Sequence, residues 1–348
     1  MVSAGAGAAA WLLQGAPIEA QPGTRPIVFR NTTVANPDLV QDDVALAVVG
    51  DTIAAIGPTP PVLQAYPNAE VIDGRGKAIF PGLINCHAHL TATLERGFNE
   101  DFGFPNSAQL KVRPASLLRG DKVALMVTVG ALEAIRTGTT TFVENAGGID
   151  RYAAALAKTG LRWVFAESIR DSENVPGPLS PDGFAKSERP VFSAKLRDEG
   201  MRKVSDLFSA WHGKNNGRIN VFPAAALTET SSPELLKAVR AFAETHDLGY
   251  TIHLNQSIAE YQFMEKWHGL RPAAYLDRHG FLGPRLFAAH ARYVDEAEIA
   301  LLGRSRTIIS HQANMAANRG VIPPIPQLRD AGARLRWAPT TTPTTSLK

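Results

Sequence analysis

The 348-residue chain carries 36 Lys and Arg against 33 Asp and Glu, a formal net charge of +3. This small excess, without a run of basic residues, argues against nucleic acid as a partner. Hydrophobic residues make up 45% of the chain, as in ordinary globular proteins, and no apolar run reaches the roughly 18 residues that cross a bilayer. The single cysteine, Cys86, excludes an intrachain disulfide, so we expect a cytoplasmic protein with no membrane partner.

The first 80 residues divide into a leader and a small β unit. Residues 1–25 are small and apolar with no Lys or Arg before the apolar part, which predicts a flexible leader and not a secretory signal. Within residues 26–80, short apolar or alternating segments are separated by turn-forming residues, which predicts a small antiparallel β unit. The predicted strands are 26–29, 44–49, 52–56 and 70–73.

From residue 81 onward, short apolar strands alternate with amphipathic helices. We predict strands at 78–85, 139–144, 162–167, 220–225, 250–254, 286–290 and 307–311. The predicted helices between them are 121–137, 149–159, 232–246, 258–267 and 295–302. Nearly continuous apolar strands are typical of a parallel sheet that is buried on both faces. Seven such units favour an α/β fold, a (β/α)8 TIM-like barrel over residues 81–335, with a doubly wound open sheet as the rival.

Five of the nine histidines fall at the C-terminal ends of predicted strands: His87, His89, His253, His290 and His311. In a barrel this end carries the active site. Alternate strand residues point to the same side, so His87 and His89 can meet one metal ion. Any single one is more often a core or strand-end histidine, but the shared position favours a metal or catalytic cluster. Histidine ligands favour zinc, iron, nickel or manganese over magnesium or calcium.

The region around His87 also resembles a known family. The run Pro81-Gly82-Leu83-Ile84-Asn85-Cys86-His87-Ala88-His89-Leu90 is similar to the first barrel strand of the amidohydrolase superfamily. The branch it most resembles holds cytosine deaminase, S-adenosylhomocysteine deaminase and the triazine hydrolases. Further similarities follow in order at Arg96-Gly97-Phe98, Gly138-Thr139-Thr140-Thr141, His253-Leu254 and Ala289-His290. The resemblance implies a distorted (β/α)8 barrel with a small β-sandwich, which residues 26–80 would help to form.

The resemblance also implies a set of site residues. His87, His89 and His253 would hold one divalent ion, zinc before iron, and His290 would act in catalysis by stabilising the charge that develops on the reacting group. Two-metal relatives carry a lysine on strand four, and the predicted strand 220–225 contains none. We expect Gln256 and His311 to contact the substrate.

The expected chemistry follows from this metal site. A bound metal lowers the pKa of water from about 15.7 to near 7, which gives hydroxide at neutral pH. We therefore expect a metal-dependent hydrolase, in which metal-bound hydroxide attacks an sp² carbon of a small cyclic or aromatic molecule and the bond from that carbon to nitrogen is cleaved. Whether the chain forms a homo-oligomer stays open.

Gln256 bears on the type of bond that is cleaved. Many deaminases of this branch have a glutamate three residues after the strand-five histidine, whereas glutamine does not titrate. This favours hydrolysis of a non-peptide amide, urea or carbamate. The alternative is an aminohydrolase of a purine, pyrimidine or triazine, with Glu260 as a weaker replacement for the missing acid.

The resemblance breaks down after Arg334. Relatives continue with a pattern like Ala-Leu-Gly-Thr-Asp-Asn, whose aspartate binds the metal, but this chain reads Arg336-Trp337-Ala338-Pro339-Thr340-Thr341. The codons GCG CTG GGC ACC GAC AAC, read one nucleotide late, encode this same Arg-Trp-Ala-Pro-Thr-Thr. We hypothesise that residues 336–348 are an out-of-frame tail, the alternative being a genuine divergent tail. On this hypothesis the eighth strand is missing or disrupted, and we expect weak metal retention and little activity. A truncated, inactive pseudoenzyme that lacks the strand-eight aspartate is the alternative function.

Overall fold

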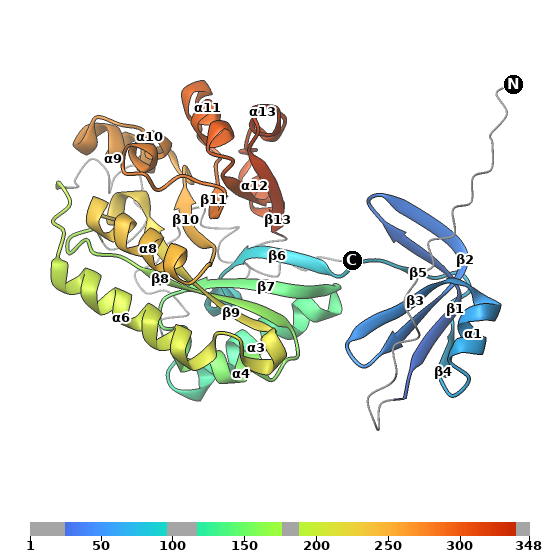
Figure 1. Ribbon diagram of the computed structural model, residues 1–348. Coiled ribbons are helices and arrows are strands. Elements are labelled where there is room, and N and C mark those ends of the chain that lie inside the picture. Colours follow the sequence, from blue (N-terminus) through green and yellow to red (C-terminus); the bar gives the residue numbers. More distant parts are fainter. Residues whose placement is uncertain (1–24, 96–116, 176–187, 339–348) are drawn as a thin grey trace, which may run out of the picture. The chain divides into compact units, whose positions relative to one another are not determined.

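The computed structural model describes residues 25–95, 117–175 and 188–338. The predicted leader 1–25 lies outside these ranges except for its last residue, and so do residues 339–348 of the predicted tail. By its internal contacts the chain divides into two compact units, one ending at Gly82 and one beginning at Leu83 (Figure 1). No helix in the described ranges is long and apolar enough to cross a membrane.

The first unit is a five-stranded sheet with one helix. Its elements are β1 (Ile27–Asn36), β2 (Leu39–Val49), β3 (Thr52–Pro58), α1 (Thr59–Ala65), β4 (Glu70–Asp73) and β5 (Ala78–Ile79). The strand β1 pairs antiparallel with β2 and parallel with β4 and β5. Val62 and Tyr66, in and just after α1, pack against Val28 and Ala45 of the sheet, which closes a small core. The predicted strands 44–49, 52–56 and 70–73 fall within β2, β3 and β4, and the predicted strand 26–29 overlaps β1 from residue 27. The unit is mixed and not purely antiparallel as predicted, because β4 and β5 pair in parallel with β1.

The second unit is a (β/α)8 TIM-like barrel, as predicted. Its parallel strands follow one another in chain order, which excludes the reversed order of a doubly wound sheet. The strands are β6 (Leu83–Ala88), β7 (Thr139–Ala146), β8 (Arg162–Ile169), β9 (Ile219–Leu227), β10 (Tyr250–Leu254), β11 (Leu286–His290), β12 (Ile308–Gln312) and β13 (Arg334–Ala338).

Helices and 3-10 turns connect these strands. They are η1 (Leu90–Glu95), α3 (Asp121–Arg136), η4 (Ile149–Arg151), α4 (Ala153–Ala157), α6 (Ala194–Trp211), α7 (Lys214–Gly217), η5 (Thr228–Thr230), α8 (Pro233–Thr245), α9 (Ile258–His268), α10 (Pro272–Arg278), α11 (Glu296–Arg304), α12 (Ala313–Arg319) and α13 (Ile325–Asp330). The serines before α8 and α9, Ser232 and Ser257, cap them by accepting from the backbone N–H three residues on.

The expectation of a missing eighth strand is wrong. The strand β13 pairs in parallel with β12 over five residues, from Ile308 opposite Arg334 to Gln312 opposite Ala338. Strand pairing uses backbone groups, so it does not require the aspartate that the sequence lacks. Leu335 also packs against the hydrophobic core that lies between the sheet and the surrounding helices, called the helix-side core below. Among the described residues β13 and β6 share no hydrogen-bonded ladder, so the barrel is nearly closed at this seam.

Alternation along the strands separates two faces. Residues such as Ile252 and Leu236 form the core between the sheet and the helices. Val143, Ala166 and Ala224 form a smaller cluster from three neighbouring strands, on the opposite face, inside the barrel. The face of the strand on which a polar residue lies therefore decides whether its side chain points into the barrel interior or toward the helices.

Candidate metal centre

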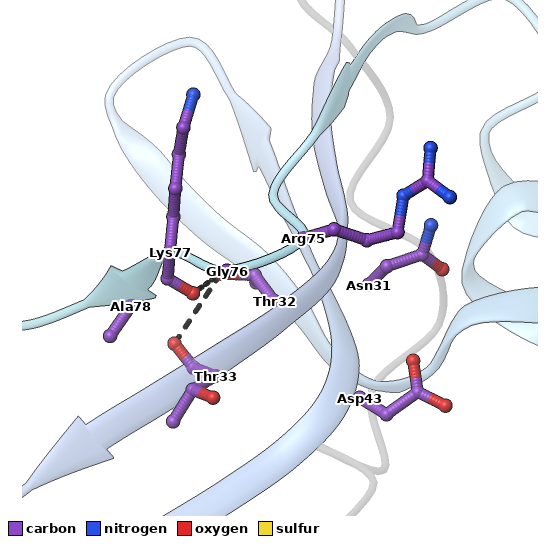
Figure 2. Close-up of a pocket in the computed structure, with 8 residues that line it drawn as sticks. All are labelled: Asn31, Thr32, Thr33, Asp43, Arg75, Gly76, Lys77 and Ala78. Atoms are coloured by element: carbon purple, nitrogen blue, oxygen red, sulfur yellow. Dashed lines mark hydrogen bonds between the residues drawn. The ribbon is translucent and has the colours of Figure 1, made fainter.

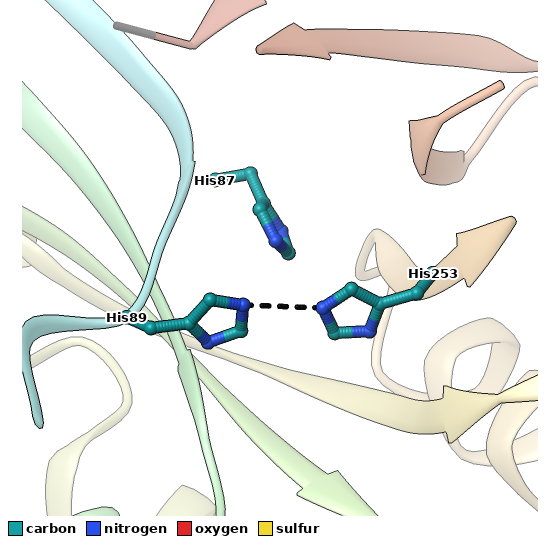
Figure 3. A group of neighbouring side chains, drawn as sticks. All are labelled: His87, His89 and His253. Atoms are coloured by element: carbon teal, nitrogen blue, oxygen red, sulfur yellow. Dashed lines mark hydrogen bonds between the residues drawn. The ribbon is translucent and has the colours of Figure 1, made fainter. Parts of the chain in front are cut away.

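Three histidines from two strands converge at the C-terminal end of the barrel. His87 lies on β6, His89 follows its last residue, and His253 lies on β10. One nitrogen from each ring lies within 4.8 Å of the others, and the three rings face a common point (Figure 3). The structure therefore brings together the three residues that the sequence predicted as metal ligands.

His87 is the most deeply buried of the three. Its side chain is 1% exposed, and neither ring nitrogen has a hydrogen-bond partner among the described residues. Burial, followed by the neighbouring His253, His89 and His290, holds the pKa of His87 well below its usual range. The imidazole is therefore neutral at pH 7, which is the form that binds a metal.

His89 and His253 are each oriented by a backbone carbonyl. The Nδ1 of His89 lies against the carbonyl oxygen of Asn145, and the Nδ1 of His253 lies 2.6 Å from that of Ala226. A carbonyl only accepts, so both Nδ1 atoms carry the proton and both Nε2 atoms present a lone pair.

The two Nε2 atoms of His89 and His253 lie 3.2 Å apart, as the dashed line in Figure 3 marks. A hydrogen bond between them requires a second proton on one ring, but burial lowers the pKa of His253 to about 3. With both rings neutral, two lone pairs that face each other at this distance repel, and a cation between them removes the repulsion. The three residues therefore fit a divalent metal ion.

His290 lies beside this group. Its ring centroid is 5.5 Å from those of His87 and His253, and its side chain is buried. The backbone has φ 83° at His290 and φ 51° at Ala291, in the left-handed region that non-glycine residues rarely adopt. Strain of this kind persists where the surrounding structure fixes it, often at functional sites.

Gln256 lies in a loop that buried side chains hold in place. The carboxylate of Glu260 accepts hydrogen bonds from the backbone N–H groups of Asn255 and Gln256, at 2.8 and 2.7 Å. The guanidinium of Arg292 donates to the carbonyl oxygen of Gln256. The side-chain Nε2 of Gln256 is buried and has no partner in the described part of the chain.

Glu260 has no carboxylate oxygen left over to interact with the histidines. Its Oε1 also accepts from the Thr228 hydroxyl at 2.7 Å, so both oxygens are engaged. Burial raises the pKa of Glu260, and burial together with the charge of Glu260 raises that of the neighbouring Glu229. The role of Glu260 is structural in this arrangement, which argues against it as a replacement for a titrating residue at position 256.

His311 is placed differently from the other strand-end histidines. On β12 it shares a strand face with Ile309, which belongs to the helix-side core, whereas Ser310 and Gln312 take the opposite face. The substrate contact predicted for His311 stays a prediction. Cys86 lies on β6 next to His87, and burial raises the pKa of its thiol to about 11.

A separate pocket lies wholly within the first unit. It has a volume of about 560 Å³, and the residues that line it are polar and charged for the most part (Figure 2). They are Asn31, Thr32, Thr33, Asp43, Arg75, Gly76, Lys77 and Ala78. This set has no histidine or cysteine, so it offers none of the ligand types found in the barrel.

Sequence reasoning missed three buried polar side chains at the functional end of the barrel. Asn145, Glu144 and Glu167 are fully or almost fully buried at the ends of β7 and β8. The signal was present in the segment Val143-Glu144-Asn145, where two polar residues end an apolar strand at the functional edge of the barrel.

A parallel barrel with histidines converging at the carboxyl ends of its strands defines a metal-dependent hydrolase type of scaffold. The chain belongs to the amidohydrolase family, whose pattern matches residues 78–337.

Several curated relatives are similar to this chain. A 5'-deoxyadenosine deaminase of Methanobrevibacter smithii is 30% identical over 301 residues, which are 85% of this chain and 64% of that protein. A 5-methylthioadenosine/S-adenosylhomocysteine deaminase of Pelotomaculum thermopropionicum is 29% identical over 86% of this chain and 65% of the relative. The chain thus spans somewhat less than two thirds of the length of these relatives.

Solved structures support the fold. An adenosine deaminase from Xanthomonas campestris with bound zinc has a TM-score of 0.77 at 24% identity, covering 91% of this chain and 69% of that one. A zinc complex of atrazine chlorohydrolase from Arthrobacter aurescens TC1 has a TM-score of 0.75 at 21% identity, covering 91% and 72%. At these identities the likeness shows a shared fold.

Proposed function

We propose that this protein is a metal-dependent hydrolase that cleaves a carbon–nitrogen bond of a small cyclic molecule. The observation that carries the proposal is the pair of Nε2 lone pairs of His89 and His253, 3.2 Å apart, beside a buried His87 without partners among the described residues. In the proposal these three histidines hold one divalent ion, with zinc ahead of iron. The absence of lysine from β9 favours one ion over two.

The bound ion would act as a Lewis acid and lower the pKa of a water molecule in its open position. The chain's own residues complete the site. His87 and His253 stay neutral because burial lowers the pKa of each. His290 lies close enough to donate a hydrogen bond to the oxygen that gains negative charge as the substrate carbon becomes tetrahedral.

The relatives favour deamination as the form of this hydrolysis. Proteins that are 29–30% identical over most of this chain act, by their names, on 5'-deoxyadenosine or on 5-methylthioadenosine and S-adenosylhomocysteine. We therefore propose an amino-substituted planar heterocycle as the substrate. Because Gln256 does not titrate, hydrolysis of a cyclic amide or urea is the second candidate. The buried thiol of Cys86, with no disulfide to form, is compatible with the cytoplasmic location that we propose.

The tail sets a limit on this chain's activity in the proposal. The strand-eight aspartate expected by resemblance falls after Ala338, beyond the described residues, and the sequence from 336 to 341 fits an out-of-frame reading. We propose that a version with the reading frame restored binds metal more tightly than the present chain. A gene whose other frames encode no such aspartate would overturn this part.

Metal content and ammonia release test the function together. We expect the frame-restored protein to hold about one zinc or iron per chain and the present chain to hold less. In the frame-restored protein His87→Ala and His253→Ala should lose the metal, while the exposed His246→Ala retains it. Metal-loaded protein, tested with and without the restored frame, should release ammonia from 5'-deoxyadenosine or from an aminotriazine. Metal binding that survives both substitutions would contradict the proposed ligand set. Failure of both versions on every heterocycle, amide and urea tested would contradict the proposed activity.

A further inference from the structure

The buried side chain of Asn145 has a role that the hydrogen bonds of the described structure do not explain. It is 0% exposed, and neither its Nδ2 nor its Oδ1 has a hydrogen-bond partner among the described residues. Buried carboxamides are almost always hydrogen-bonded, so an unpaired one points to a partner that binds from outside the chain.

The strand geometry decides where this side chain points. The ladder between β7 and β8 runs without a register shift from Thr141 to Ala146, so alternation holds along this stretch. Glu144 faces the helix layer, where it accepts from the Tyr152 hydroxyl and from the N–H of Leu90. Val143 belongs to the opposite cluster with Ala166 and Ala224. Asn145 therefore lies on the inner face, one alternation beyond Val143 toward the carboxyl end of the strand.

Asn145 is also level with the histidines. Ala88 is the register partner of Glu144, which places Asn145 beside His89. The carbonyl oxygen of Asn145 contacts the Nδ1 of His89. The residue that orients one candidate metal ligand through its backbone thus presents an unpaired carboxamide to the same interior.

We propose that the Asn145 side chain recognises the substrate. It would form two hydrogen bonds with the edge of a heterocycle on which a ring nitrogen lies next to an exocyclic N–H. A carboxamide carries an acceptor oxygen and a donor nitrogen on the same carbon, and asparagine pairs in this bidentate way with such an edge of adenine. Gln256, whose buried Nε2 is also unpaired in the described structure, supplies a second neutral donor. The recognition is by neutral groups, so the ligand class is an uncharged amino-substituted heterocycle. This inference rests on the proposed function and narrows its substrate class.

Asn145→Leu is the variant of choice. Leucine keeps the shape and removes both unpaired polar atoms, so we expect the ligand-free protein to unfold at the same or a higher temperature. A structural asparagine with hidden partners would instead lower the unfolding temperature. Asn220→Leu is the matched control, because Asn220 lies on the inner face of β9 near its amino end, away from the histidines.

Calorimetry on the zinc-loaded protein then measures the binding of adenosine, 1-deazaadenosine and 7-deazaadenosine. We expect wild type and Asn220→Leu to bind adenosine at least about tenfold more tightly than one of the two deaza analogues. Asn145→Leu should bind adenosine at least about tenfold more weakly than the wild type does. It should bind adenosine and that analogue with equal affinity.

The outcomes separate this inference from the function on which it rests. If wild type binds adenosine and Asn145→Leu keeps the same discrimination, or if it weakens all three ligands equally, the role of Asn145 is refuted while the hydrolase proposal stands. If zinc-loaded wild type binds none of the three nucleosides, the inference and the heterocycle substrate both fail. Loss of zinc in Asn145→Leu would also count against it, because the residue would then act through His89.

Discussion

The Nε2 atoms of His89 and His253 lie 3.2 Å apart, although 164 residues separate the two histidines in the chain. Each ring is turned so that its Nδ1 meets a backbone carbonyl, which leaves both lone pairs facing the same point. The backbone carbonyls thus hold both nitrogens in the orientation that binds a cation, even when no cation is bound. The arrangement therefore predicts how the protein responds to metal.

Zinc should stabilise the folded protein through this pair. A ligand that binds only the native state adds about 2.7 kcal/mol at a free concentration 100 times its Kd. We expect the midpoint of urea unfolding to rise accordingly on adding zinc to the metal-free protein. His253→Phe removes one of the two nitrogens and should abolish the rise, whereas His246→Phe, at an exposed position, should keep it. An equal rise in both variants would show that zinc binds elsewhere.

The metal-free protein should lose stability in mild acid. Histidine titrates near pH 6.5 in an unfolded chain, whereas burial lowers the pKa of folded His253 to about 3 and that of His87 well below its usual value. Below pH 6.5 the unfolded chain therefore binds more protons than the folded one. The contribution of these two residues is complete above pH 6.5 and is lost as the pH falls toward 3.

Urea unfolding at pH 7.5, 6.0 and 5.0, with a chelator present, measures this loss. His87→Leu removes one buried imidazole, so its free energy of unfolding should fall less steeply with acid than that of the wild type. The same pH dependence in both proteins would mean that His87 is not held neutral in the folded state.

The histidines and the barrel were accessible from the sequence because each depends on a local pattern. An apolar strand that ends in histidine places His253 or His290 at the edge of the sheet, whatever the details of packing. Chain order then brings these edges together. The eighth strand was misjudged because the prediction relied on a side-chain motif, whereas β13 forms through backbone pairing with β12.

The buried polar partners were not accessible in the same way. The contact of Glu260 with the N–H groups of Asn255 and Gln256 depends on the left-handed backbone of Asn255, with φ 48°. No periodicity in the sequence reports such a loop conformation. Asn145 was overlooked because an asparagine in a strand carries no chemistry of its own until its neighbours are known.

Glu144 should make the folded protein sensitive to alkali. Burial raises its pKa to about 8, against an ordinary value near 4.5, and its oxygens accept from Leu90 and Tyr152. A raised folded pKa gives stability that is complete below pH 4.5 and is lost as the pH rises through 8. Glu144→Gln should therefore lose less stability between pH 6 and 9 than the wild type. Glu296→Gln, at an exposed position, should follow the wild type; if Glu144→Gln does so too, the buried acid is not protonated.

Glu260→Gln should loosen the loop after β10. Both carboxylate oxygens accept from backbone N–H groups, and a glutamine presents an N–H to one of them. Leaving one buried donor unsatisfied costs about 1–3 kcal/mol of unfolding free energy. Hydrogen exchange at Asn255 and Gln256 should become faster, while Glu265→Gln, exposed on the same helix, should leave both measurements unchanged. Unaltered exchange in Glu260→Gln would remove Glu260 as the anchor of this loop.

Gly303→Ala tests whether the last helix and strand pack as described. In a helix interior this change ordinarily stabilises by about 1 kcal/mol. Here a Cβ at Gly303 of α11 would clash with the backbone carbonyl group of Ala331, at the end of α13. The backbone cannot yield as a side chain can, so we expect a loss of about 1–3 kcal/mol in urea unfolding. Gly200→Ala is the control, because the atoms nearest to its Cβ would be those of the Ile169 side chain, at 3.0 Å and beyond. If Gly303→Ala is as stable as that control, α13 does not dock on α11, and the support for β13 beside it is lost.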